Sequence, residues 1–209
     1  YTRTTPTAVP DSAIVDCPPV FHVVSEVTTD DGAAGQQVVN YMYGGLKANL
    51  KGKGVLGLSY TKAANSTQGT ATVSGVSEWN CESLLPKKTY TRQFLGNDSS
   101  ETVTQFSSTK PHLQKAWFTR PVSALTTDMD GNESRVTTIY NPDYGYITRK
   151  YEQWDDMNSV AHNYNDYSCY NGIWLPSTIE NVSYSQTSDD LTTETYYEYN
   201  TRGDRKSVV

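Results

Sequence analysis

The stretch that decides the fold class is TYTRQFLGNDSSETVTQF, residues 89–106. On both sides of Gly96-Asn97-Asp98, β-branched and aromatic residues are frequent, which is typical of strands bounded by a turn. Glycine and asparagine tolerate the positive φ that a tight hairpin requires. The stretch therefore predicts two antiparallel strands, over 89–95 and 102–106, joined by this turn.

Segments of the same character recur along the chain, each bounded by glycine, proline, asparagine or aspartate. We expect strands over 20–28, 36–43, 70–74, 117–127, 135–140, 146–154, 174–184 and 193–199. Thr29 to Gly35 should end the first of these strands and join it to the second, so that the two strands form a hairpin. Stretches of fifteen residues with helical periodicity are absent, which argues against βαβ enzymes. The prediction is an all-β fold, an antiparallel strand-turn-strand meander that forms a large curved sheet or partial β-shell with little helix.

Composition supports this fold class and limits the function. The chain of 209 residues has 27 threonines, 20 serines and 16 tyrosines against 4 phenylalanines. Threonine and tyrosine pack against cross-strand neighbours while their hydroxyls stay hydrated. The net charge of −6 argues against a binder of nucleic-acid phosphates, which needs clustered lysine and arginine. No long apolar run occurs, so we expect no membrane insertion by this segment.

Three cysteines, Cys17, Cys81 and Cys169, cannot all be paired within one chain. We expect packed free thiols, with one long-range disulfide as the alternative. No Cys or His spacing suggests zinc, and we predict neither a metal nor a cofactor.

Two stretches share a plan of tyrosine, turn, glycine and strand. They are Tyr140-Asn141-Pro142-Asp143-Tyr144-Gly145-Tyr146-Ile147-Thr148 and Tyr197-Glu198-Tyr199-Asn200-Thr201-Arg202-Gly203-Asp204-Arg205-Lys206-Ser207. Both resemble the YD repeat, although asparagine stands where the repeat usually has aspartate. The tyrosine should pack on the sheet, the asparagine should cap the turn and the glycine should take a positive φ. These residues are Tyr140, Asn141 and Gly145 in the first stretch, and Tyr199, Asn200 and Gly203 in the second.

An upstream block carries a second resemblance. It comprises Phe21 to Val27, Asp31-Gly32, Tyr41-Met42-Tyr43-Gly44-Gly45-Leu46-Lys47 and Lys51-Gly52-Lys53-Gly54-Val55-Leu56-Gly57-Leu58. This pattern resembles the block Y-x-Y-x-G, spacer, G-R-G-F-L-G-F that precedes the repeats in insecticidal toxin complex B subunits and related RHS proteins. Its candidate motif residues here are Tyr41, Tyr43, Gly52, Gly54 and Gly57. Lys53 replaces the arginine, and Val55 and Leu58 replace the phenylalanines.

The resemblance covers residues 20–209 and implies a non-enzymatic structural segment of a large secreted bacterial RHS/YD-repeat toxin. Such a segment would contribute to a β-ribbon shell that encapsulates a toxic C-terminal region, so secretion or cell-surface location is expected, with the signal outside this segment. Its partners would be neighbouring repeats and the toxin region of the same polypeptide. Strand edges could also self-associate.

The organisation that follows is an irregular lead-in over 1–19, a pre-repeat β region over 20–133 and YD-repeat-like hairpins over 134–209. We expect one continuous architecture, truncated at both ends.

Three motif matches have simpler interpretations. Gly52 to Gly57 fits G-x-G-x-x-G, but no helix follows to face a phosphate, so bent β-structure is preferred. Arg202-Gly203-Asp204 is explained by the second YD-like turn rather than by integrin binding. Asp128, Asp130 and Asn132 begin like a calcium loop, yet the later glycine and glutamate are missing, so a hairpin turn is preferred.

No catalytic site is predicted. His22, His112 and His162 are far apart in sequence, and the Asp155-Asp156 pair beside Trp154 would point to opposite faces of a strand. The alternative function is a cell-surface adhesion or carbohydrate-binding β module. Its candidate residues are Trp79, Trp154, Trp174, Tyr164, Tyr167 and Tyr170, for which packing within the ribbon is the preferred interpretation.

Overall fold

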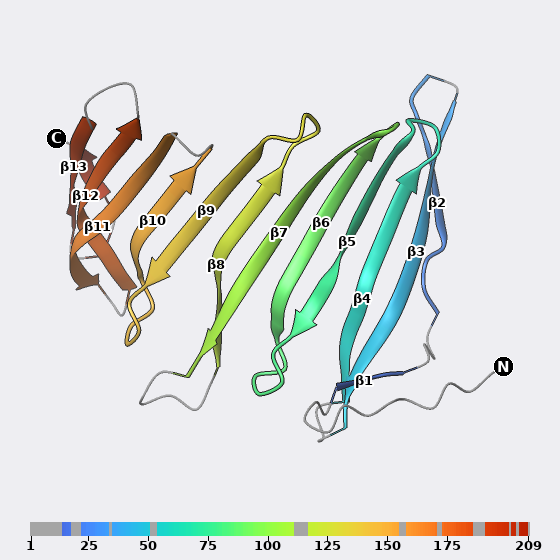
Figure 1. Ribbon diagram of the computed structural model, residues 1–209, viewed down its shortest axis with the longest axis horizontal. Helices are drawn as coiled ribbons and strands as arrows, with labels where there is room; N and C mark the ends of the chain where they lie inside the picture. The colour runs from blue at the N-terminus through green and yellow to red at the C-terminus, as the bar shows by residue number, and fades with distance from the viewer. Residues whose placement is uncertain are drawn as a thin grey trace. The chain divides into compact units, whose positions relative to one another are not determined.

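The computed structural model describes residues 14–17, 22–33, 35–50, 54–110, 117–154, 158–170, 173–185, 191–200, 202–203 and 205–208. Within them lie fourteen strands and no helix, which confirms the predicted all-β fold. The chain divides into two compact units, Tyr1–Ser108 and Thr109–Val209 (Figure 1).

The first unit is one antiparallel sheet. Its strands are β1 (Ile14–Asp16), β2 (Glu26–Asp30), β3 (Gln36–Asn49), β4 (Gly54–Asn65), β5 (Thr70–Trp79), β6 (Pro86–Leu95) and β7 (Asp98–Thr109). From β3 to β7, each strand pairs with the next one in the chain. The long strand β3 also pairs with β2 through its first residues and with β1 through its last.

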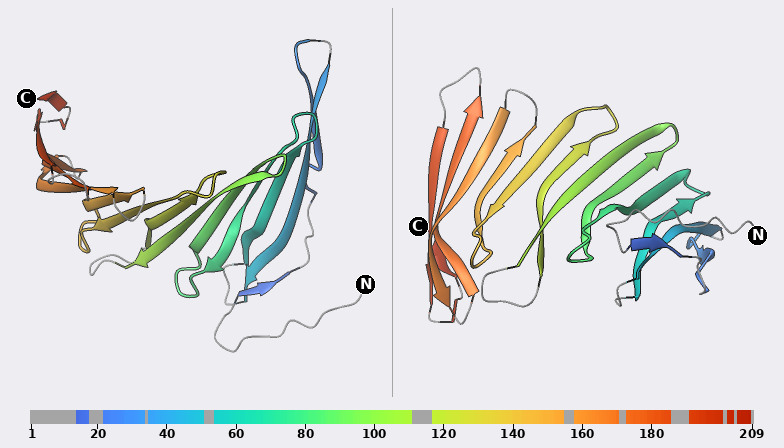
Figure 2. Two further views of the ribbon diagram at one scale, coloured as in Figure 1. Left: turned by 45° about the horizontal axis from the view of Figure 1, so that its top comes forward. Right: turned by 60° about the horizontal axis from the view of Figure 1, so that its bottom comes forward.

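The second unit is likewise an antiparallel meander. Its strands are β8 (Phe118–Thr127), β9 (Glu133–Tyr140), β10 (Ile147–Gln153), β11 (Asn158–Tyr170), β12 (Ile173–Ser185), β13 (Leu191–Tyr199) and β14 (Arg205–Val208). Each strand pairs with its successor. Within each unit the strands are twisted, as Figure 2 shows, and among the strands that the structure describes no pairing joins the first to the last.

The predicted hairpin forms, but its turn is shorter than predicted, because Asp98 is the first residue of β7 and not part of the turn. Leu95 pairs with Asp98, so Gly96 and Asn97 are the two loop residues, and Gly96 has a φ of 60°. Positive φ at the first loop position suits the right-handed twist of the flanking strands. The two strands of this hairpin are longer than predicted, because β6 begins at Pro86 and β7 ends at Thr109.

Some strand predictions were wrong in their limits. The predicted end of the first strand before Thr29 is wrong, because β2 continues through Thr29 to Asp30. Its predicted start at Val20 also differs, because β2 begins at Glu26. The second predicted strand, 36–43, continues as β3 through a pair of glycines to Asn49. Strand β11 was not predicted, because its polar sequence lacks the alternation of a half-buried strand.

A row of alternating glycine and tyrosine crosses four strands of the first unit. Gly44 pairs with Tyr60, Tyr60 with Gly75 and Gly75 with Tyr90, so all four residues share one face of the sheet. A Cβ at Gly44 would lie 2.3 Å from Cε1 of Tyr60, and a Cβ at Gly75 would lie 2.0 Å from the carbonyl oxygen of Ser59. The glycines therefore make room for the tyrosine rings and for the neighbouring backbone.

Neither sheet has a developed core of its own. Among the described residues, Leu46 and Ala161 are the apolar side chains that are buried. Large apolar side chains are instead exposed, including Met42 at 58%, Val55 at 61% and Ile173 at 63%. Because leucine, isoleucine and valine are usually buried in globular domains, these sheets leave much apolar area uncovered.

Candidate functional site: the asparagine turns and the aromatic cluster

The first YD-like turn has the predicted geometry. The Oδ1 atom of Asn141 accepts hydrogen bonds from the backbone N–H groups of Asp143 at 3.0 Å and Tyr144 at 2.9 Å. The N–H of Gly145 donates to the carbonyl of Asn141 at 2.9 Å, and Gly145 has a φ of 77°. The asparagine side chain thus satisfies the donors of its own turn, and glycine takes the left-handed position.

The second YD-like turn is built in the same way but is one residue shorter. The Oδ1 atom of Asn200 accepts from the N–H of Arg202 at 2.9 Å. The N–H of Gly203 donates to the carbonyl of Asn200 at 2.9 Å, and Gly203 has a φ of 89°. The predicted roles of these asparagine and glycine residues are confirmed in both turns.

The tyrosine that precedes each asparagine reaches across to a proline carbonyl. The hydroxyl of Tyr140, at the end of β9, donates to the carbonyl of Pro121 in β8 at 2.8 Å. The hydroxyl of Tyr199, at the end of β13, donates to the carbonyl of Pro176 in β12 at 2.9 Å. Each tyrosine therefore ties the end of its strand to the strand before it. Sequence analysis predicted that these tyrosines pack on the sheet but not which carbonyl each would meet.

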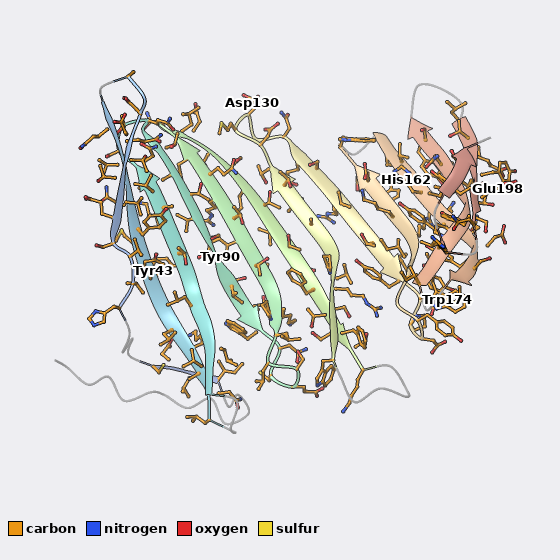
Figure 3. The ribbon with its side chains drawn as sticks, turned by 180° about the vertical axis from the view of Figure 1, so that it is seen from behind. Tyr43, Tyr90, Asp130, His162, Trp174 and Glu198 are labelled. Atoms are coloured by element: carbon orange, nitrogen blue, oxygen red, sulfur yellow. The ribbon has the colours of Figure 1, made fainter. Side chains whose placement is uncertain are left out.

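An aromatic cluster surrounds the first turn. The rings of Tyr146 and Tyr167 stack with centroids 3.9 Å apart, and Tyr144 contacts Trp174 at 4.8 Å with a tilt of 44°. Trp174 also lies 5.6 Å from Tyr146 (Figure 3). Tyr144 is 62% exposed, so the cluster presents one ring to solvent. Aromatic pairs of this kind stabilise a fold beyond their buried area.

Burial raises the pKa of Tyr167 to about 12, with smaller contributions from Tyr164, Tyr146 and Tyr199. The Tyr167 hydroxyl donates to the carbonyl of Ile147, at the start of β10. A neutral, hydrogen-bonded tyrosine suits a packing role.

Arg120 lies between rings on the same unit. Its guanidinium carbon is 5.4 Å from the ring centroids of both Phe118 and Tyr140. A Cβ at Gly145 would lie 1.8 Å from an Arg120 nitrogen, so the glycine also makes room for this side chain. Burial raises the pKa of Tyr140, and the Arg120 charge partly offsets that rise. The cation therefore joins β8 to the first turn.

The upstream motif residues lie on β3 and β4. Val39, Tyr41 and Tyr43 share one face of β3, and the two tyrosine rings lie 6.4 Å apart and nearly parallel. Gly54 and Gly57 belong to β4, with φ of 72° and 140°. A phosphate loop at Gly52 to Gly57 would need a helix directly after it, but β4 continues there to Asn65. The preferred interpretation as bent β-structure is therefore confirmed. Gly52 lies outside the described residues.

The carbohydrate candidates lie in both units, and the side chain of Tyr170 is outside the described residues. Trp174 and Tyr167 both contact Tyr146 in the aromatic cluster. Trp154 is 50% exposed at the end of β10, and Trp79 packs near Gly57 in the first unit. The prediction missed Tyr144 and Tyr146, although their place inside the first YD-like stretch was a usable signal.

The loop that resembles a calcium site is a self-contained turn. One oxygen of the Asp128 carboxylate accepts from the N–H groups of Asp130 and Asn132, and the other accepts from the Asn132 amide. The Asn132 side chain, and then its backbone N–H, hold the pKa of Asp128 below its usual value. No group of three or more metal-ligating side chains occurs among the described residues.

Two of the three histidines lie in the described part of the chain, one in each unit. His162, labelled in Figure 3, lies in β11 with Nδ1 2.6 Å from Oδ1 of Asn181. Its neighbour in β10 is Lys150, which is ion-paired with Glu152. His22 lies before β2, in the other unit. His112 and the Asp155-Asp156 pair lie outside the described residues.

Cys17, Cys81 and Cys169 are all free thiols, which agrees with the favoured prediction. The expectation that they are packed was wrong for Cys81 and Cys169, which are exposed. Cys81 lies in the turn after β5, and Cys169 lies near the end of β11.

The fold and the asparagine turns define an all-β chain of successive antiparallel ribbons. No family model, no curated protein and no solved structure matches this chain. The described residues contain no helix of the length and apolarity that a membrane span requires.

Proposed function

We propose that this chain is a non-enzymatic structural segment of a large secreted bacterial protein of the RHS/YD-repeat toxin class, where it contributes to a β-ribbon shell. Its partners in that role are the adjoining repeats and the toxin region of the same polypeptide. The protein would be secreted or held at the cell surface. The segment works by enclosing space and not by chemistry.

The observation that carries the proposal is the scarcity of buried apolar residues in extensively paired sheets. Leu46 and Ala161 alone are buried among the apolar side chains described, although every strand is paired. A repeat wall has this character, because each unit buries a face only when its neighbours cover it. The two YD-like turns support the same class, since each combines an asparagine cap, a left-handed glycine and a tyrosine that ties adjacent strands.

Accessibility of the two sheet faces tests the proposal. Met42 pairs with Lys62, and Lys62 pairs with Val73, so these three side chains share one face of the first unit. Thr72 precedes Val73 on the same strand and therefore lies on the opposite face. Met42 and Thr72 are both exposed. Single cysteines would be placed at Met42 or Thr72 in a background without the three native cysteines. They would be labelled with a bulky polyethylene-glycol maleimide in the excised chain and in the full-length polypeptide.

We expect both cysteines to react readily in the excised chain. In the full-length polypeptide, one of them should react at least tenfold more slowly, because a shell separates an inner face from an outer face. Equal labelling of both positions in the full-length polypeptide would reject the shell.

Carbohydrate binding is a second candidate function, favoured by one observation. Tyr144 is exposed beside Trp174, and an aromatic ring held in place by a second ring is a surface on which a sugar can stack. A glycan array with the variants Tyr144→Ala and Trp174→Ala tests it. Tyr196→Ala is the matched control, because Tyr196 is 52% exposed on the same unit and is not one of the carbohydrate candidates. Saturable binding that is lost in the first two variants and kept in the control would support this candidate over the wall.

A further inference from the structure

A turn in which the asparagine follows an aromatic residue occurs three times among the described residues, about sixty residues apart. Asn65, at the end of β4, accepts the same two side-chain hydrogen bonds, but it follows Ala64 and is not part of this series. Asn80 follows β5, Asn141 follows β9 and Asn200 follows β13, so the turn closes every fourth strand. The last two carry the Tyr-Asn pair and the glycine of the sequence pattern. The first has Trp79 before the asparagine and Leu84 in the place of the glycine, so the sequence alone conceals it.

The side-chain hydrogen bonds of the first turn match those of the second. The Oδ1 atom of Asn80 accepts from the N–H groups of Glu82 and Ser83, both at 2.9 Å. The Oδ1 atom of Asn141 accepts from the residues two and three positions ahead of it in the same way. An asparagine therefore organises both turns by the same two contacts.

The backbone of the two turns also matches. Leu84 donates to the carbonyl of Asn80 at 2.8 Å, and Asn80 donates to the carbonyl of Leu85 at 2.9 Å. In the second turn, the N–H of Gly145 donates to the carbonyl of Asn141 at 2.9 Å, and the N–H of Asn141 donates to the carbonyl of Tyr146 at 2.8 Å. Leu84 even adopts a φ of 59°, a left-handed conformation that leucine rarely takes. The turn at Asn80 therefore has the same backbone geometry as the turn at Asn141, although leucine disfavours a positive φ.

In all three copies, the aromatic residue before the asparagine contacts the preceding strand. Tyr140 and Tyr199 donate to the prolines of β8 and β12. The Trp79 ring lies 3.8 Å from the position of a Cβ at Gly57 in β4. The indole N–H of Trp79 is buried and has no hydrogen-bond partner among the described residues. The Trp79 ring thus lies close to the preceding strand, as the two tyrosines do, but it does not make their hydrogen bond.

Strand lengths follow the same four-strand period. In the copy that contains Asn80, β5 and β6 have 10 residues each, between β4 and β7 with 12 each. In the next copy, β9 and β10 have 8 and 7 residues, between β8 with 10 and β11 with 13. The inner two strands are the shorter ones in both copies.

We propose that the chain is a tandem array of one four-strand unit, with β4–β7 as one copy, β8–β11 as the next and β12–β14 as the first three strands of a third. The partner of each unit is then another unit of the same kind. For the second copy, the interaction surface is the edge of β11, which pairs with β12 from Asn158↔Ser185 to Tyr170↔Ile173. This inference rests on the turns and the pairings, independently of any shell.

Removing whole and half units tests the array. Deletion of residues 81–141 joins Asn80 to Pro142 and removes four strands, β6 to β9, while the rest of the second turn closes the chain. The matched control deletes residues 97–131, which joins Gly96 to Asn132 and removes two strands, β7 and β8. The control keeps a Gly-Asn loop at the junction and preserves strand direction. The two variants therefore differ in whether a whole four-strand unit or half of one is removed.

Duplications make the same comparison without removing any strand. One variant repeats residues 81–141 after Asn141, and its control repeats residues 97–131 after Gly131. We expect both whole-unit variants to keep a β-sheet circular dichroism spectrum and one cooperative thermal transition, with a larger unfolding enthalpy in the duplication. We expect both half-unit variants to lose the cooperative transition. The array is rejected when the half-unit variants unfold as cooperatively as the whole-unit ones, or when neither whole-unit variant unfolds cooperatively.

Discussion

The hydroxyl of Tyr140 donates a hydrogen bond of 2.8 Å to the carbonyl of Pro121, and so joins the end of β9 to β8. A hydrogen bond of this kind contributes about 0.5–1.5 kcal/mol to stability. We expect Tyr140→Phe to lower the free energy of unfolding by about 1 kcal/mol, measured by urea denaturation. Tyr144→Phe is the control, because that ring is 62% exposed and its change should stay within about 0.5 kcal/mol. Equal effects of the two substitutions would show that the bond adds nothing.

The contact of Gly75 with the backbone of β4 predicts a large loss of stability on adding one methyl group. A Cβ at Gly75 would lie 2.0 Å from the Ser59 carbonyl oxygen, which cannot move without breaking the strand pairing. We expect Gly75→Ala to cost about 1–3 kcal/mol in thermal or urea unfolding. The control is Ser74→Ala, one residue away and exposed on the opposite face, which should be nearly neutral. A neutral Gly75→Ala would contradict the close approach.

The buried hydroxyl of Tyr167 predicts a loss of stability at alkaline pH. Its pKa is about 12 in the folded chain and about 10 in the unfolded chain, so folding favours the protonated form. The stability that this group contributes is complete below pH 10 and falls progressively between about pH 10 and 12. Urea denaturation across this range should show a smaller loss for Tyr167→Phe than for the parent chain. The same dependence of stability on pH in the variant and in the parent chain would refute the raised pKa of Tyr167.

The turn at Asp128 predicts the opposite dependence at acid pH. Hydrogen bonds from the Asn132 side chain and backbone lower the pKa of this carboxylate, so its stabilising effect is present above its ordinary pKa of 3.8. The effect is lost as pH falls through the lowered folded value. Asp128→Asn should flatten the dependence of unfolding on pH below about 4. Asp130→Asn removes the same charge from the same loop and should not flatten it, and identical profiles would show that the turn bonds are not responsible.

The sequence was sufficient for the fold class because residue type and turn chemistry are local signals. Thr89 to Phe106 has β-branched and aromatic residues on both sides of a glycine turn, and a hairpin forms there, although Asp98 belongs to the strand. The turns at Asn141 and Asn200 were predictable for the same reason. The turn at Asn80 was not, because Leu84 takes the left-handed position that patterns assign to glycine.

Contacts between strands were beyond the reach of the sequence, because they depend on register. Nothing local indicates that Gly75 lies beside Tyr60 and Tyr90, or that the Tyr140 hydroxyl meets the Pro121 carbonyl. The aromatic cluster was likewise only partly predicted, since Tyr146 reaches Tyr167 across the β10–β11 pairing. Pairing over long sequence distances decides these contacts.

Electron cryomicroscopy of the full-length polypeptide that contains this segment tests the central claim most directly. We predict density in which the strands of residues 14–208 continue through backbone pairing into flanking ribbons and enclose a cavity on one side. A compact domain that is joined to the rest of the polypeptide by unstructured linkers, with both faces of its sheets in solvent, would contradict the account.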